Sequence, residues 1–158
     1  MEIQTIKNGS TKLIAYTDGG DNRILQSTEM PAPEWNHAWE NLALDYKCIL
    51  AKELGVNTAK IGGFIQDHII KFNKIHFKYK DGEVTPQTYE VWGHHSVGNT
   101  GYDTDIHLSF TFGNENAPDK AALALREAGK DYAMNKRGEV DMFEQDMPEE
   151  TAGKTEEG

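Results

Sequence analysis

Phe72-Asn73-Lys74-Ile75-His76-Phe77-Lys78-Tyr79-Lys80 is the stretch of sequence that decides the fold. Apolar and polar side chains alternate along it, with Ile75, Phe77 and Tyr79 set against Lys74, His76, Lys78 and Lys80. A two-residue period predicts a β-strand with one buried face and one solvated face. The turn sequence Asp81-Gly82 follows at once and predicts the end of this strand.

Two further strands are expected on the C-terminal side. Thr88 to Trp92 is predicted to pair with the strand above, and residues 106–112 show the same alternation. The Gly- and Asn-containing segment His94 to Asp103 is predicted to be the loop between them. Upstream, residues 56–70 leave two structures open, because Ile61-Gly62-Gly63-Phe64-Ile65 fits either a bend into a strand or a loop before a short helix.

The N-terminal residues 2–30 predict a three-stranded meander. Asn8-Gly9-Ser10 and residues 18–22 are turn sequences, because Gly and Asn tolerate a positive φ. They separate the strand candidates, which end before Pro31, since proline cannot donate to a sheet ladder.

Two helices are expected. Residues 34–54 carry an apolar stripe of 3.6-residue period that starts with Trp35 and Trp39, which we interpret as core anchors. Cys48, the only cysteine, falls among these apolar positions and is expected to be a small buried side chain in a reducing compartment. A second helix is predicted over residues 117–134.

Together these elements predict an α+β fold. An antiparallel sheet is built from the N-terminal meander and about three later strands, with the helices packed on one face. We expect a single domain over residues 1–136 and an acidic, flexible tail over 137–158. Residues 139–158 contain eight Asp or Glu against one Lys, a net charge of −7 out of −10 for the whole chain.

Composition narrows the class of protein. The acidic balance argues against wholesale binding to nucleic-acid phosphates. There is no apolar run of the length that spans a bilayer and no secretion signal, so we expect a cytoplasmic protein without a membrane partner, in the host cytoplasm if phage-encoded. No cofactor is expected, and the oligomeric state is left open.

One cluster has the chemistry of a metal site. His94, His95 and His107 lie close in sequence to Asp103 and Asp105, and imidazole and carboxylate suit several divalent metals. A metal-dependent enzyme is therefore one hypothesis for this segment. The alternative is that these are ordinary polar residues of a loop and the strand that follows it.

A second candidate is the polar face of the strand at 72–80. Basic side chains could follow a single-stranded nucleic-acid backbone while aromatic rings stack on bases: Lys71, Lys74, Lys78 and Lys80, with Tyr89 and Trp92. The acidic tail would then be autoinhibitory. The alternative is a solvated strand face whose lysines protect an edge from aggregation.

The tail contains one short motif. Glu139-Val140-Asp141-Met142-Phe143 resembles the bacterial sliding-clamp-binding pentapeptide, whose usual form is Gln, Leu, Ser or Asp, Leu, Phe. Asp141 and Phe143 match, whereas Glu139, Val140 and Met142 substitute. The resemblance implies an extended segment that inserts its last two apolar side chains into a pocket of the clamp. Alternatively, Met142 and Phe143 pack back on the domain.

The wider pattern resembles a family of small, uncharacterised bacteriophage and prophage proteins. The similarity runs from Thr11-Lys12-Leu13-Ile14-Ala15-Tyr16 through the proline-led helix at 33–54 to Met142-Phe143. It implies a phage accessory protein and carries no activity with it. Our first hypothesis is thus a non-enzymatic protein that binds a host protein, such as the clamp or another replication or defence component, through residues 139–143.

Overall fold

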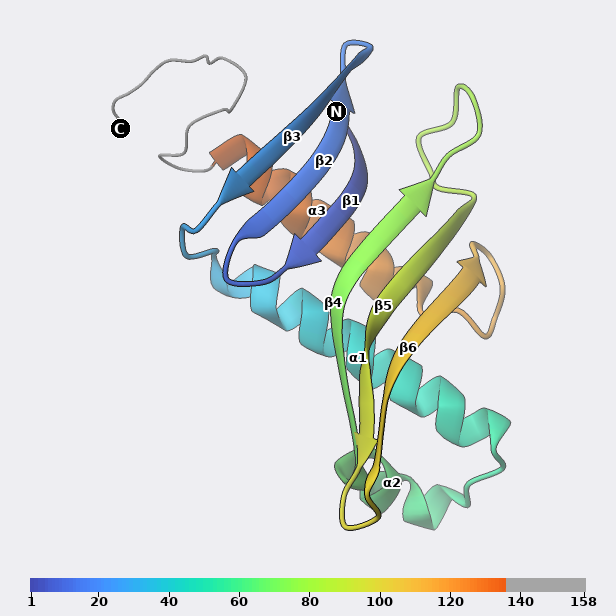
Figure 1. The fold of residues 1–158 in the computed structure, drawn as a ribbon. Helices are drawn as coiled ribbons and strands as arrows, with labels where there is room; N and C mark the ends of the chain where they lie inside the picture. The colour runs from blue at the N-terminus through green and yellow to red at the C-terminus, as the bar shows by residue number, and fades with distance from the viewer. Residues whose placement is uncertain (136–158) are drawn as a thin grey trace.

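A computed structural model describes residues 1–135 of the chain (Figure 1). Six strands form one antiparallel sheet in the order β3-β2-β1-β4-β5-β6. The two long helices both lie against the same face of this sheet, so the predicted α+β class is confirmed. No helix within residues 1–135 has the length and apolar character needed to cross a membrane.

The N-terminal meander forms as the turn sequences predict. It consists of β1 (Glu2–Asn8), β2 (Lys12–Asp18) and β3 (Asp21–Ser27). Gly19 and Gly20 in the second turn have φ of 60° and 87°, a region that glycine enters without steric cost.

The helices build the core against the sheet. Helix α1 (Pro33–Glu53) packs on β4, and α3 (Asp119–Asn135) packs on β1 and on α1. Gly129 of α3 permits this close approach, because a Cβ there would lie 2.4 Å from Ile6 Cδ1. The largest side chains that are almost fully enclosed come from α1, α3 and the sheet: Trp35, Tyr89, Phe77, Ile3, Ile6, Ile14, Leu42, Ile75 and Leu125.

Cys48 differs from the expectation. It is exposed on α1. Residues four apart share one face of a helix, and Cys48 stands between the exposed Leu44 and Lys52 on the solvent side. Cys48 therefore lies outside the apolar stripe of α1 that packs on the sheet.

The second half of the chain contains longer elements than expected. The open segment 56–70 forms a 3₁₀ turn, Thr58–Lys60, and the short helix α2, Ile61–Asp67. Strand β4 then begins directly at His68 and runs to Lys78. Strands β5 (Thr88–Val97) and β6 (Tyr102–Thr111) extend into the predicted loop 94–103, so that prediction is wrong.

The two halves of the chain repeat one order of elements, three antiparallel strands followed by a long helix. Their first strands, β1 and β4, meet at the centre of the sheet. They pair through only three residue pairs, Thr5–His76, Ile6–Ile75 and Lys7–Lys74. Because β1 ends at Asn8, residues 68–72 of β4 have a strand partner on the β5 side alone (Figure 1), and Asn73, at a bulge, is paired with neither strand.

Candidate functional site

The uncovered face of the sheet carries a row of three side chains at its centre. Trp92 lies between Lys74 of β4 and His107 of β6. The Lys74 ammonium is 4.4 Å from the centre of the Trp92 ring, and the His107 ring stacks on Trp92 at 4.5 Å. A cation over an indole and a parallel ring contact both stabilise this arrangement. Both faces of the Trp92 ring are therefore in use.

Glu90 bonds to two neighbouring residues of this face, His107 and Lys78. Its carboxylate accepts a hydrogen bond from His107 at 2.7 Å and pairs with Lys78 at 3.0 Å. These partners favour the charged form, and the pKa of Glu90 is lowered, chiefly by the hydrogen bond with His107 and next by that with Lys78. Lys78 is thus already paired within the face.

Lys7, Lys71 and Lys74 make no ion pair with another of residues 1–135. Lys7 and Lys74 stand directly opposite each other across the β1–β4 pairing. Like charges in this position repel and destabilise a sheet. An anion above this part of the face would relieve the repulsion.

The three histidines of the predicted metal site are not brought together. His94 and His107 lie on the uncovered face, while His95 is on the opposite, buried face, since successive residues of a strand point to opposite sides. Among the described residues no group of three or more His, Cys, Asp or Glu is placed to hold a metal ion. The adjacent acids instead bond to one histidine: Asp103 and Asp105 both contact His94 and raise its pKa, Asp105 more than Asp103.

His95 has a different partner. Its Nε2 lies 2.9 Å from Nδ1 of His68, the first residue of β4. Burial is the main cause that lowers the pKa of His95, and the neighbouring charges of His68, His94 and Lys47 lower it further. This pair lies on the helix-covered side of the sheet, where one ring nitrogen donates a hydrogen bond to the other.

Two residues of the nucleic-acid hypothesis lie away from the lysine face. Tyr89 is 0% exposed on the helix-covered side, and its hydroxyl donates to the Asp119 carboxylate at 2.7 Å. Lys80 is exposed but lies beyond the end of β4. Lys71, Lys74, Lys78 and Trp92 are the members that share the uncovered face.

A groove of about 560 Å³ runs beside the unpaired edge of β4. Its floor is apolar, with Trp39 and Ala43 of α1 next to Ile70 and Phe72 of β4. Polar side chains form its rim: Lys71, His94, Asn8, Asn36, Asn73 and Glu40. Every second N–H and C=O of a strand edge points away from its one partner, so β4 presents hydrogen-bonding groups to this groove.

Trp39 adds an unsatisfied donor. It is 5% exposed, and its indole N–H has no hydrogen-bond partner among residues 1–135. Buried polar groups are nearly always hydrogen-bonded, so an unpaired donor in the wall of a groove calls for an explanation.

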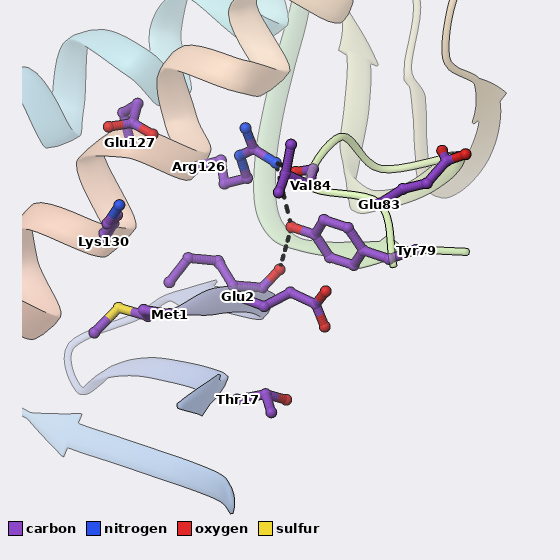
Figure 2. Close-up of a pocket in the computed structure, with 10 residues that line it drawn as sticks. Met1, Glu2, Thr17, Tyr79, Glu83, Val84, Arg126, Glu127 and Lys130 are labelled. Atoms are coloured by element: carbon purple, nitrogen blue, oxygen red, sulfur yellow. Dashed lines mark hydrogen bonds between the residues drawn. The ribbon is translucent and has the colours of Figure 1, made fainter. Parts of the chain in front are cut away.

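A second hollow, of about 360 Å³, lies where β1, the loop after β4 and α3 meet (Figure 2). Two of its polar side chains, Tyr79 and Arg126, form hydrogen bonds across it. The Tyr79 hydroxyl donates to the Ile3 carbonyl at 2.7 Å, and Arg126 donates to the Val84 carbonyl at 2.9 Å and to the Tyr79 hydroxyl at 3.5 Å. We interpret the Tyr79 and Arg126 contacts as a clasp, because they connect β1 and the loop after β4 to α3.

The predicted clamp motif, Glu139 to Phe143, and the tail that contains it lie outside the described residues. No family model matches the chain, and no curated protein and no solved structure matches it either.

The sequence did not predict the free edge of β4 or the groove beside it. Asn8-Gly9-Ser10 does predict where β1 stops, but the place where β1 meets β4 depends on pairing between residues 71 positions apart, such as Thr5 with His76. Only this register leaves the first residues of β4 unpaired, and no local pattern encodes it.

Proposed function

We propose that this chain is a non-enzymatic interaction protein that binds an extended segment of another polypeptide along the free edge of β4. The observation that carries the proposal is the unpaired stretch His68–Asn73 beside a groove with an apolar floor. A peptide can add a strand to such an edge, with its main chain giving affinity and alternate side chains giving specificity.

The groove indicates the chemistry of the bound segment. Side chains that point toward α1 would meet Ile70, Phe72 and Trp39, so they should be apolar. Those that point to the uncovered side would lie beside Lys71, which makes no ion pair with a described residue, so an acidic side chain is favoured there. The proposed ligand is therefore an extended segment in which apolar and acidic residues alternate.

The proposal is tested with a synthetic peptide of alternating valine and aspartate, titrated into the full-length chain and followed by backbone amide shifts. We expect the largest shifts at residues 68–73. The same peptide with N-methyl groups on alternate amides should not bind, because those amides can no longer donate to β4. Equal binding of the methylated peptide would exclude strand addition.

A matched pair of lysine variants tests the rim. Lys71→Glu should weaken peptide binding about two- to fivefold, since one exposed charge pair contributes roughly 0.2–1 kcal/mol. Lys80→Glu makes the same change at an exposed site beyond the strand and should leave affinity unaltered. Equal effects of the two variants would remove Lys71 from the site.

Single-stranded nucleic acid is a second candidate ligand, at a different place. The like-charged pair Lys7 and Lys74 beside Trp92 favours it, since a phosphate would relieve the repulsion. A base could stack on Trp92 only after Lys74 swings off the ring toward that phosphate. Oligothymidylate should then bind less tightly to Lys74→Ala than to Lys80→Ala, with affinity that falls as salt rises. Absence of binding at low salt would exclude this candidate.

Capture of a host protein by residues 139–143 remains a proposal that rests on the pentapeptide resemblance. Its test is binding of purified bacterial sliding clamp to the full-length chain and to the Met142→Ala, Phe143→Ala double variant. Loss of binding in the double variant would support the motif. The metal-dependent alternative is not carried forward, because its three histidines lie on two faces of the sheet.

A further inference from the structure

We infer that residues Val140–Phe143 of this same chain occupy the β4 edge as an added strand, in competition with the outside ligand. This inference rests on the peptide-binding edge proposed above. It comes from the position at which the described chain ends, from the pattern of side chains along β4 and from the charges beside it.

The end of the described chain is connected to the groove by two side-chain contacts. The Tyr132 ring, in the last turn of α3, lies 5.1 Å from the Trp35 ring. The Trp35 indole in turn donates to the Asn8 side chain at 2.9 Å, and Asn8 lines the groove. The five steps from residue 135 to residue 140 span up to about 17 Å when extended, and the inference takes residue 140 to the Asn8 end of the groove.

A segment that enters at Asn8 continues the path of β1 and runs antiparallel to β4. Its side chains must then alternate between the helix side and the uncovered side, as those of β4 do. If Asp141 stands opposite Lys71, the other pairs follow directly: Val140 with Phe72, Met142 with Ile70 and Phe143 with Ile69.

These pairs match in chemistry on both sides of the sheet. On the helix side, Val140 and Met142 would add apolar surface next to Ile70 and Phe72, above Trp39. The uncovered side would pair Asp141 with Lys71 and cover Ile69, an apolar residue that is 49% exposed. A shift by one residue would turn the Asp141 carboxylate into the apolar floor, so that shift is disfavoured.

The added strand would regulate the site. A tethered segment acts at an effective concentration of roughly millimolar, so a partner must displace it before it binds. The acidic residues of the tail then serve to hold the edge closed, and they also keep an exposed strand edge from pairing with another copy of the chain.

Disulfide trapping tests the register in the full-length protein. One chain carries Cys48→Ser, Lys71→Cys and Asp141→Cys, and the control carries Cys48→Ser, Lys71→Cys and Met147→Cys. Facing residues of an antiparallel pair have Cα atoms about 4.5–5.5 Å apart, which suits a disulfide. Both described positions, 48 and 71, are exposed, so the substitutions leave the core intact.

We expect the first chain to form an intramolecular disulfide at least about tenfold faster than the control, because the tether alone acts equally in both chains. Equal rates would overturn the inference. Disulfides that join two molecules would also overturn it, because the occupant would then be the tail of a second copy.

A second measurement separates this inference from the proposed function. The valine–aspartate peptide should bind Met142→Asp about tenfold more tightly than Met147→Asp, since only the first change releases the edge. Equal, measurable affinity for both variants overturns the tail inference and leaves the peptide site standing. If the disulfide forms but the peptide binds neither variant, the tail is a structural strand and the proposed function fails.

Discussion

The indole N–H of Trp35 donates a hydrogen bond of 2.9 Å to the side-chain oxygen of Asn8, which joins the first turn of α1 to the last residue of β1. This contact holds the end of β1 over the helix at the point where the β4 edge becomes free. Trp39, four residues further along the helix, has the same indole donor with no described partner. The indole N–H groups of these two tryptophans therefore differ in hydrogen bonding.

That difference gives the first prediction. Trp35→Phe and Trp39→Phe both remove an indole from a nearly enclosed position, but only the first breaks a hydrogen bond. We expect Trp35→Phe to lower the free energy of unfolding by about 1 kcal/mol more than Trp39→Phe. Urea denaturation of the two variants measures the difference, and equal losses would show that the Asn8 contact adds nothing.

Gly93 supports the second prediction. A Cβ at this position would lie 2.2 Å from the Lys71 carbonyl oxygen and 2.8 Å from the Phe72 Cα, both backbone atoms of β4. Gly93→Ala should therefore destabilise the protein by about 1–3 kcal/mol or separate β5 from β4 locally. Thermal unfolding checks this.

Gly63 in α2 is the matched control, because a Cβ there meets nothing within 4 Å. Gly63→Ala should leave stability unchanged or raise it by up to about 1 kcal/mol, since alanine favours a helix. An equal loss in both variants would mean that the contacts at Gly93 are not the cause.

Tyr89 is expected to be a structural residue. Burial is the main cause that raises the pKa of its hydroxyl, and the hydrogen bond to Asp119 raises it further. Asp119 also accepts from the Gly113 backbone N–H at 2.8 Å, so Tyr89 helps to position the start of α3. Tyr89→Phe should cost about 1.5–3 kcal/mol, the range for hydrogen bonds to a charged group. Tyr102→Phe, at a residue that is 49% exposed, should cost within about 0.5 kcal/mol.

His95 predicts a pH dependence of stability. Its pKa is lowered in the folded protein, first by burial and then by His68, His94 and Lys47. Below a pH of about 6.5 the unfolded chain binds a proton at this site that the folded chain resists, so stability falls as the pH drops. His95→Gln should flatten this fall between about pH 6.5 and 5. The pKa of His76 is also lowered, chiefly by burial, so part of the slope should remain.

Denaturant unfolding at a series of pH values measures the slope, and His37→Gln serves as the control. His37 is exposed on α1, so its replacement should leave the slope as in the wild-type chain. A slope that is the same in the wild type and in His95→Gln would contradict the buried histidine pair as its origin.

Much of the fold could be predicted from periodicity. The alternation at 74–80 and 106–112 and the stripe from Trp35 through Trp39 come directly from which side chains face the core. The extent of β5 could not be predicted from periodicity. Gly93 is typical of a loop in sequence, and only its close contact with Phe72 explains why a glycine stands within the strand. Helix α2 forms in spite of Gly62 and Gly63, and Lys47 of α1 donates to the Ile65 carbonyl within it.

The candidate sites were harder to predict. Tyr89 and Trp92 are three residues apart, and in a regular strand that spacing puts them on opposite faces, so their separation could have been inferred. The same rule separates His94 from His95 once β5 is known to reach them. The groove beside β4 could not be inferred, since it depends on where two strands distant in sequence stop pairing.

The narrow seam between β1 and β4 has a consequence for how the chain folds. Each meander is made of neighbours in sequence and can form early, whereas the three pairs of the seam must close a loop of about seventy residues. Such distant pairing is slow relative to the formation of hairpins and helices. We therefore expect two partly formed halves to dock in the last step of folding, guided by the contact of α1 with α3.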